Sequence, residues 1–230
     1  SALAKLGAKY KIIKGYVHAE TNKGLVGTVI RFSSVSVGAT ENIIIAATLA
    51  KNRTILKNCA IEPEIKDLVN FLNLAGGKLK WIGKRTIQID GVKNLNSVNY
   101  SIMNDRIEAG TWLIAAALTE GTLRVGTIDH KLIQTEINIL KKIGAKIKTY
   151  KNEIHIKGPK KIKNIDSIVT KEYPNFPTDL QAQFMVLLCK ASGRSTITEN
   201  VFQNRFIHAE ELKRLGARIN IKNNKAIIEG

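Results

Sequence analysis

Three polar clusters in the sequence could do chemistry, because each places hydroxyl or carboxyl side chains and small residues just before an apolar run. They are SVSVGATEN from residue 34, IMNDRIEAG from residue 102 and FPTDLQAQ from residue 176. If each apolar run is a helix, its start carries free N–H groups and partial positive charge, which bind anions such as phosphates. Ser36, Asp105 and Asp179 then either take part in binding or catalysis, or only cap these helices.

The cysteines and histidines give weaker signals. Cys59 and Cys189 lie in apolar segments without metal-type spacing, so we interpret both as core thiols of a reduced, cytoplasmic protein. No metal site is expected from the histidines, which we place on strand surfaces or near exposed helix starts: His18, His130, His155 and His208.

One phrase occurs four times along the chain. It reads KLGAKYKIIKGYVHAE, LAGGKLKWIGKRTIQIDG, KIGAKIKTYKNEIHIKG and RLGARINIKNNKAIIEG, and its anchoring glycines are Gly7, Gly76, Gly144 and Gly216. A recurrence at a nearly fixed period of this size indicates an internal repeat. Each glycine follows an amphipathic run and could end a helix, because glycine adopts the left-handed C-cap conformation at little cost.

The most complete repeat, residues 27–91, predicts strand, buried helix, strand, amphipathic helix and hairpin. The segment SVGATENIIIAATLA is apolar on nearly every face, which is typical of a helix buried all round. Ile65, Leu68, Val69 and Leu72 have the spacing of an amphipathic helix. The hairpin is expected over residues 79–91, with its turn at Gly83-Lys84.

Further copies are expected over residues 100–158 and 164–230, and residues 1–24 hold the tail of an earlier one. Trp112 falls in the buried helix of the 100–158 copy, so we expect it in the core. Wholly apolar helices require an architecture with helices inside and sheets outside. The sequence therefore predicts an α/β protein of repeated β-α-β-α-β-β units.

Composition excludes some classes of function. The net charge is +17, but 27 of the 36 basic residues are lysines spread over expected hairpins and outer helix faces. Base reading and bidentate phosphate contacts favour arginine, so we expect no nucleic-acid partner, although a small anionic ligand is compatible with the charge. No apolar run reaches membrane-spanning length, so no membrane partner is expected.

Six phrases in order along the whole chain carry a family resemblance: VSVGAT, AATLA, EPEI, DRIEAGT, FPTDLQAQF and TENVFQNRF. The chain resembles the UDP-N-acetylglucosamine enolpyruvyl transferases. The sister family that makes enolpyruvyl-shikimate phosphate shares the fold but not the last two phrases. The resemblance implies an incomplete inverted α/β barrel of the enolpyruvyl transferase type, with ligands bound between two three-unit domains. Residues 1–99 would be the C-terminal part of the first domain, and residues 100–230 the first two units of the second.

The resemblance also implies an activity. The family transfers enolpyruvyl from phosphoenolpyruvate to the 3-hydroxyl of UDP-N-acetylglucosamine and releases phosphate. This is the first committed step of peptidoglycan synthesis in the bacterial cytoplasm, and so belongs to cell-wall biogenesis, cell shape and cell division. The reaction needs no metal or organic cofactor.

Site residues follow from the resemblance by position. In FPTDLQAQF, Asp179 matches the family's proposed base on the sugar hydroxyl. In TENVFQNRF, Val201 matches a position that lines the nucleotide-sugar site, and Arg205 matches a basic residue near it. Asp105 and Arg106 match an acid–base pair for which a hinge or structural role is at least as good an interpretation as catalysis.

The segment VSVGAT matches the part of the family that holds the uridine diphosphate. The matching residues are Val35, Ser36, Val37 and Gly38. The family commonly has a lysine immediately before them, where this chain has Ser34, and this departure predicts weaker phosphate binding.

Several family features have no counterpart in these residues, namely an upstream Lys-Asn pair, an arginine for phosphoenolpyruvate and a mobile loop with a reactive Cys or Asp. We therefore expect an inactive internal fragment that self-associates through uncovered repeat faces. Two alternatives stay open. One is an enzyme like enolpyruvyl-shikimate-phosphate synthase, and the other is a non-catalytic nucleotide-sugar-binding or scaffold repeat protein.

Overall fold

The computed structural model describes residues 2–230, which form two compact units. The first ends at Met103 and the second spans Asn104–Gly230. The assignment of residues 1–99 and 100–230 to parts of two larger domains stays a prediction.

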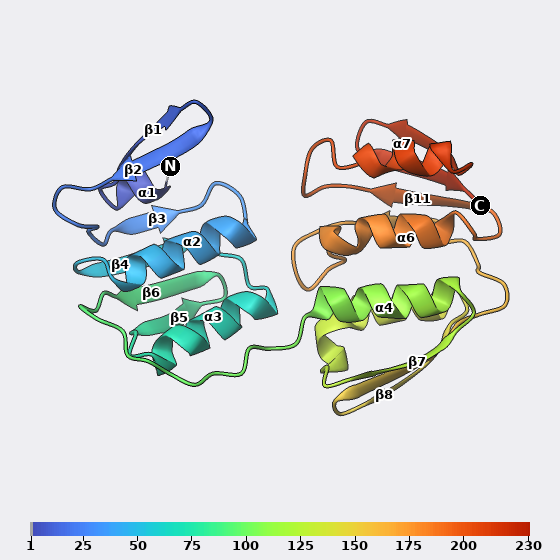
Figure 1. Cartoon of the computed structure of the whole chain (residues 1–230), viewed down its shortest axis with the longest axis horizontal. Helices are drawn as coiled ribbons and strands as arrows, with labels where there is room; N and C mark the ends of the chain where they lie inside the picture. Colours follow the sequence, from blue (N-terminus) through green and yellow to red (C-terminus); the bar gives the residue numbers. More distant parts are fainter. Residues whose placement is uncertain (1) are drawn as a thin grey trace. The chain divides into compact units, whose positions relative to one another are not determined.

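The first unit begins with the expected helix end and hairpin and continues with one full repeat (Figure 1). Its repeat has a four-stranded sheet in the order β3-β4-β6-β5, in which β3 and β4 are parallel and the other neighbours antiparallel. The elements are α1 (Ala2–Lys5), β1 (Lys9–Ile13), β2 (Tyr16–Glu20), β3 (Val29–Arg31), α2 (Val37–Thr48), β4 (Arg53–Lys57), α3 (Pro63–Leu74), β5 (Leu79–Gly83) and β6 (Thr86–Asp90).

The second unit holds two further repeats, with separate sheets in the orders β7-β9-β8 and β10-β11-β13-β12. Strand β10 runs parallel to β11, as β3 does to β4. The elements are α4 (Arg106–Leu118), β7 (Thr122–Gly126), η1 (His130–Ile133), α5 (Gln134–Lys142), β8 (Lys146–Tyr150), β9 (Glu153–Lys157), β10 (Ile168–Val169), η2 (Thr178–Leu180), α6 (Gln181–Leu188), β11 (Arg194–Thr198), α7 (Ile207–Arg214), β12 (Arg218–Lys222) and β13 (Lys225–Glu229).

Two local predictions were wrong. Within residues 2–230, the middle repeat has no opening strand, because the segment before α4 is held by α3 instead of a sheet: the hydroxyl of Tyr100 donates to the Asp67 carboxylate at 2.8 Å. The β5–β6 turn lies one residue later than expected, because Gly83 still pairs with Thr86 beyond a strand irregularity.

The repeat glycines behave as predicted. Gly7, Gly76, Gly144 and Gly216 have φ values of 96°, 98°, 109° and 96°, each just after a helix. A residue with a Cβ would be strained in this left-handed region, so one backbone requirement explains why the phrase keeps its glycine.

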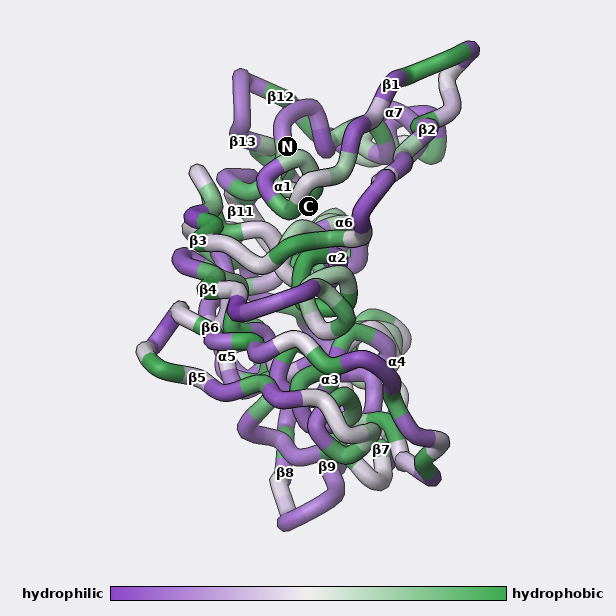
Figure 2. The backbone as a smooth tube through the Cα atoms, turned by 90° about the vertical axis from the view of Figure 1, so that its left-hand side faces the viewer, coloured by the Kyte–Doolittle hydropathy of each residue, from purple (hydrophilic) through white to green (hydrophobic). Residues whose placement is uncertain are grey.

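The buried helices are not buried all round in this chain. Ile44 and Leu113 are fully buried, whereas Ile45, Leu49 and Trp112 are 54%, 55% and 56% exposed. The prediction that Trp112 lies in the core was therefore wrong, because its face of α4 is not covered. Figure 2 shows the hydrophobic colouring of α2 and the hydrophobic end of the β1–β2 hairpin.

Close packing around α4 explains one small residue. A Cβ on Gly110 of α4 would lie 2.6 Å from the side chain of Leu180, the last residue of η2, so α4 and η2 approach each other where Gly110 leaves room. Gln183 of α6 donates to the Thr111 hydroxyl of α4 at 3.1 Å. Among the described residues, no helix has both the length and the apolar character needed to cross a bilayer.

Candidate active site

Asp179 lies in the short helix η2 and points its carboxylate at Arg205. Arg205 Nη2 donates to Asp179 Oδ1 at 2.8 Å, across 26 residues of sequence. In the described part of the chain, no side chain caps η2 or α6. The capping alternative for Asp179 is therefore wrong, and the carboxylate, whose side chain is 56% exposed, is accessible to a ligand.

Arg205 is held from two sides. Besides the ion pair with Asp179, its guanidinium lies over the Phe202 ring, 5.0 Å from the ring centroid. Val201 lies in the same loop and is 38% exposed. The fold thus brings FPTDLQAQF and TENVFQNRF together, and they form a half-exposed acid–base pair beside an accessible apolar side chain.

Glu199 is a residue of this site that sequence reasoning missed. It directly follows β11, is 3% exposed and accepts hydrogen bonds from hydroxyl, amide and backbone groups. Burial by itself raises the pKa of Glu199, but the hydrogen bonds from Thr170, Thr178 and the backbone outweigh it, so the pKa lies below its usual value. The only sequence signal was an acidic residue next to a strand inside TENVFQNRF.

His208 also differs from its prediction as a surface residue. Its Nε2 atom is buried and, among the described residues, has no hydrogen-bond partner. Burial and, secondarily, the charge of Arg205 lower the pKa of His208.

The second candidate cluster is the start of α2. Ser36 is its N-cap: the Ser36 hydroxyl accepts from the Ala39 N–H at 3.3 Å, so the capping interpretation is right for this residue. The N–H groups of Val37 and Gly38 belong to the first turn, where a helix supplies no backbone acceptor. A Cβ at Gly38 would meet nothing within 4 Å, so packing in this chain does not require glycine there. Val35 is half-buried immediately before the cap.

Asp105 and Arg106 have structural roles at the start of α4. The Asp105 carboxylate accepts from the N–H groups of Ile107 and Glu108 at 2.7 and 3.1 Å, which makes it the N-cap. Arg106 is buried and lies over the Tyr173 ring, 5.5 Å from its centroid. These contacts favour the structural interpretation over catalysis.

The cysteines are poor nucleophiles. Cys59 is fully buried, and burial raises the pKa of its thiol to about 11. Burial also raises the pKa of Cys189, which is partly exposed. The described residues contain no group of three His, Cys, Asp or Glu side chains placed to hold a metal ion.

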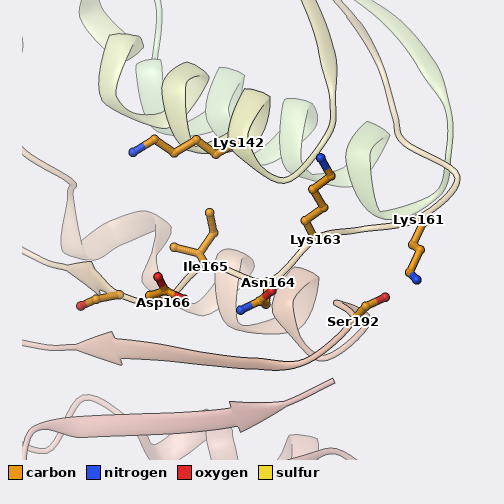
Figure 3. A pocket seen from close by; sticks show the side chains of 8 residues that line it. Lys142, Lys161, Lys163, Asn164, Ile165, Asp166 and Ser192 are labelled. Carbon is orange, nitrogen blue, oxygen red and sulfur yellow. The ribbon is translucent and has the colours of Figure 1, made fainter.

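A hollow of about 770 Å³ in the second unit has a basic rim. Figure 3 shows that the ammonium groups of Lys142, Lys161 and Lys163 point away from one another. Three diverging lysines provide no common anion site, so this hollow is not part of the candidate site.

The profile of the EPSP synthase (3-phosphoshikimate 1-carboxyvinyltransferase) family matches residues 1–230. The chain belongs to this family. Membership agrees with the repeated units of the fold.

Curated relatives show which enzymes of the family this chain is most similar to in sequence among those compared. The UDP-N-acetylglucosamine 1-carboxyvinyltransferase of Pelagibacter ubique is 66% identical over 229 residues, which are 100% of this chain and 55% of that protein. The enzyme of the same name from Beijerinckia indica is 45% identical over 229 residues, which are 99% of this chain and 53% of that protein. These matches confirm the resemblance to the UDP-N-acetylglucosamine enzymes, and the chain spans about half the length of the curated relatives it matches.

Solved structures confirm the fold. The enolpyruvyl transferase NikO from Streptomyces tendae aligns with a TM-score of 0.87 at 21% identity, over 99% of this chain and 57% of that one. The EPSP synthase from Acinetobacter baumannii aligns with a TM-score of 0.69 at 22% identity, over 99% and 55%. At such identities the likeness shows the fold alone. The present sheets are separate, and no closed barrel forms from the described residues.

Proposed function

We propose that the full-length protein containing this chain transfers enolpyruvyl from phosphoenolpyruvate to the 3-hydroxyl of UDP-N-acetylglucosamine. The observation that carries the proposal is the 66% identity, over the whole chain, to a UDP-N-acetylglucosamine 1-carboxyvinyltransferase. The proposal places the protein in the cytoplasm, in peptidoglycan synthesis and thereby in cell shape and division.

In this proposal Asp179 removes the proton from the attacking sugar hydroxyl. Arg205 orients the Asp179 carboxylate, and Val201 contacts the nucleotide-sugar. A half-exposed carboxylate with one fixed ion-pair partner retains lone pairs for a substrate hydroxyl. A general base of this kind contributes roughly 10²- to 10⁴-fold to the rate.

The start of α2 would bind the diphosphate. Its first-turn N–H groups and partial positive charge favour an anion, and Gly38 lets a phosphate approach the backbone closely. Val35, Ser36 and Val37 hold this turn in place. Ser34 supplies a hydroxyl where a lysine would add charge, so phosphate binding depends chiefly on the backbone.

The test is phosphate release by the purified full-length protein. We expect turnover that requires both phosphoenolpyruvate and UDP-N-acetylglucosamine. Turnover with shikimate 3-phosphate in place of the nucleotide-sugar would instead establish the shikimate-type activity. Nucleotide-sugar binding by calorimetry with no turnover under any of these conditions would establish a non-catalytic binding protein.

A further inference from the structure

A single buried carboxylate joins the two segments that carry Asp179 and Arg205. Glu199 directly follows β11, and Thr170 directly follows the parallel neighbouring strand β10. Because the two strands are parallel neighbours, Glu199 and Thr170 lie at the same end of the strand pair. Glu199 is 3% exposed and Thr170 is fully buried, so this junction is closed to solvent, whereas the acid–base pair is accessible.

The two oxygens of Glu199 reach different segments. Oε1 accepts from the Thr170 hydroxyl at 2.8 Å and from the N–H groups of Val201 and Phe202 at 2.8 and 3.1 Å. Oε2 accepts from the Thr178 hydroxyl at 2.8 Å and from Gln181 Nε2 at 3.4 Å. Oε1 thus holds the loop before Arg205, while Oε2 holds the residue adjacent to Asp179.

The other repeats show that the fold does not require a carboxylate at this position. The residue directly after the equivalent strand is Asn58 after β4 and Thr127 after β7. Asn58 Nδ2 donates to the Phe32 carbonyl at 3.1 Å and so bridges its parallel strands with a neutral amide. Of the three described strands compared, β4, β7 and β11, only β11, in the repeat that contains Asp179 and Arg205, is followed by an acidic residue.

A buried charge is costly unless it is paired or fully hydrogen-bonded. None of the described hydrogen-bond partners of Glu199 is a cation, so donors alone compensate its charge. We infer that Glu199 is a positioning residue, which fixes Asp179 through Thr178 and fixes Val201 and Arg205 through the loop backbone. The kinetic effects expected from this role rest on the proposed function.

The substitution Glu199→Gln keeps the side-chain shape but turns an NH₂ group toward donors on one side. In the full-length enzyme we expect kcat to fall roughly 10- to 100-fold and KM for UDP-N-acetylglucosamine to rise, because small displacements of reacting groups cost this much. The matched control is Glu229→Gln, which removes an exposed partner of Arg194 in the same sheet and should leave both constants unchanged.

Substitutions of Thr178 distinguish a positioning role of Glu199 from a general effect on stability. Thr178→Val removes the hydrogen bond from the Thr178 hydroxyl to Glu199 but leaves the bonds of Glu199 to the loop of Val201, so kcat should fall while KM for UDP-N-acetylglucosamine stays within about threefold. Thr178→Ser keeps the hydroxyl and should restore kcat. A Glu199→Gln enzyme with kcat near that of the parent, or a Thr178→Ser enzyme as impaired as Thr178→Val, would overturn the inference.

A second readout does not depend on activity. Well below the melting temperature, trypsin should cut after Arg205 about tenfold faster in Glu199→Gln than in the parent or in Glu229→Gln, because the loop opens locally. If the parent shows no turnover, the proposed function fails, and the cleavage rate alone tests whether Glu199 holds the loop. Unchanged cleavage would then overturn the inference, and faster cleavage would uphold the holding role.

Discussion

At the residue scale, Asp179 combines accessibility with a fixed partner. Its carboxylate is bound to Arg205 and caps no helix, so loss of the carboxylate removes an ion pair and a candidate base but no helix cap. An ion pair this exposed contributes about 0–1 kcal/mol to stability.

This geometry makes Asp179→Asn an informative substitution in the full-length enzyme. We expect turnover to fall roughly 10²- to 10⁴-fold, because asparagine cannot accept the proton, while the melting temperature stays nearly unchanged. Steady-state phosphate release and thermal unfolding measure the two effects. Turnover within about tenfold of the parent, with nucleotide-sugar still bound, would remove Asp179 from the catalytic residues.

At the scale of single elements, the start of α2 is built like an anion site and has an unexplained glycine. Glycine in a helix costs roughly 0.5–1 kcal/mol relative to alanine, and nothing described near Gly38 forbids a Cβ. In the proposed function, this glycine allows the diphosphate to approach the backbone closely.

Gly38→Ala should therefore separate stability from binding. The melting temperature should hold or rise slightly, while KM for UDP-N-acetylglucosamine should increase about tenfold because the added methyl group blocks the phosphate. Thermal unfolding and initial rates provide the measurements. An unchanged KM would mean that the diphosphate does not approach this turn.

Helix α5 carries a second buried acid, Glu136, which is 3% exposed. Burial raises the pKa of Glu136 to about 7, although a backbone hydrogen bond and the nearby Arg106 act in the opposite direction. The folded protein therefore keeps this proton between its ordinary pKa of 4.5 and about 7, where the unfolded chain loses it. More protons bound in the folded state mean that stability falls as pH rises through this range.

The substitution Glu136→Gln should abolish that slope. Relative to the parent, the variant should gain stability from pH 4.5 to 7, by up to about 3 kcal/mol, and keep the gain above pH 7. Urea unfolding at several pH values measures this, and Glu210→Gln, at an exposed pair with Lys213 on α7, is the control. Parallel pH profiles for the parent and Glu136→Gln would contradict the prediction.

At the scale of the whole molecule, the accessible apolar helix faces are the main feature. Ile45 on α2, Leu49 directly after α2 and Trp112 on α4 are each more than half exposed. Contiguous exposed apolar surface drives association.

We expect the 230-residue chain on its own to form dimers or larger species. Light scattering after size-exclusion chromatography should show a mass that rises with concentration, and Ile45→Lys together with Trp112→Gln should lower it because the apolar faces become polar. Lys222→Gln, on the exposed end of β12, serves as a control. A monomer that persists over a wide concentration range would contradict this expectation.

The sequence by itself determined the local features of this protein. The four repeat glycines, the amphipathic spacing of α3 and the caps Ser36 and Asp105 act within a few residues of themselves. Short-range requirements of this kind leave a pattern in the chain, so the repeat and almost every element could be predicted. The family phrases added the proposed roles of Asp179 and Val201.

Only the tertiary structure decided how these pieces meet. The pairing of Asp179 with Arg205 and the enclosure of Glu199 join segments that are 18 to 29 residues apart. The burial of the His208 Nε2 atom and the exposure of Trp112 depend on which neighbouring elements cover each face. Such contacts have no period along the chain, because they arise from the packing of elements whose order in space differs from their order in sequence.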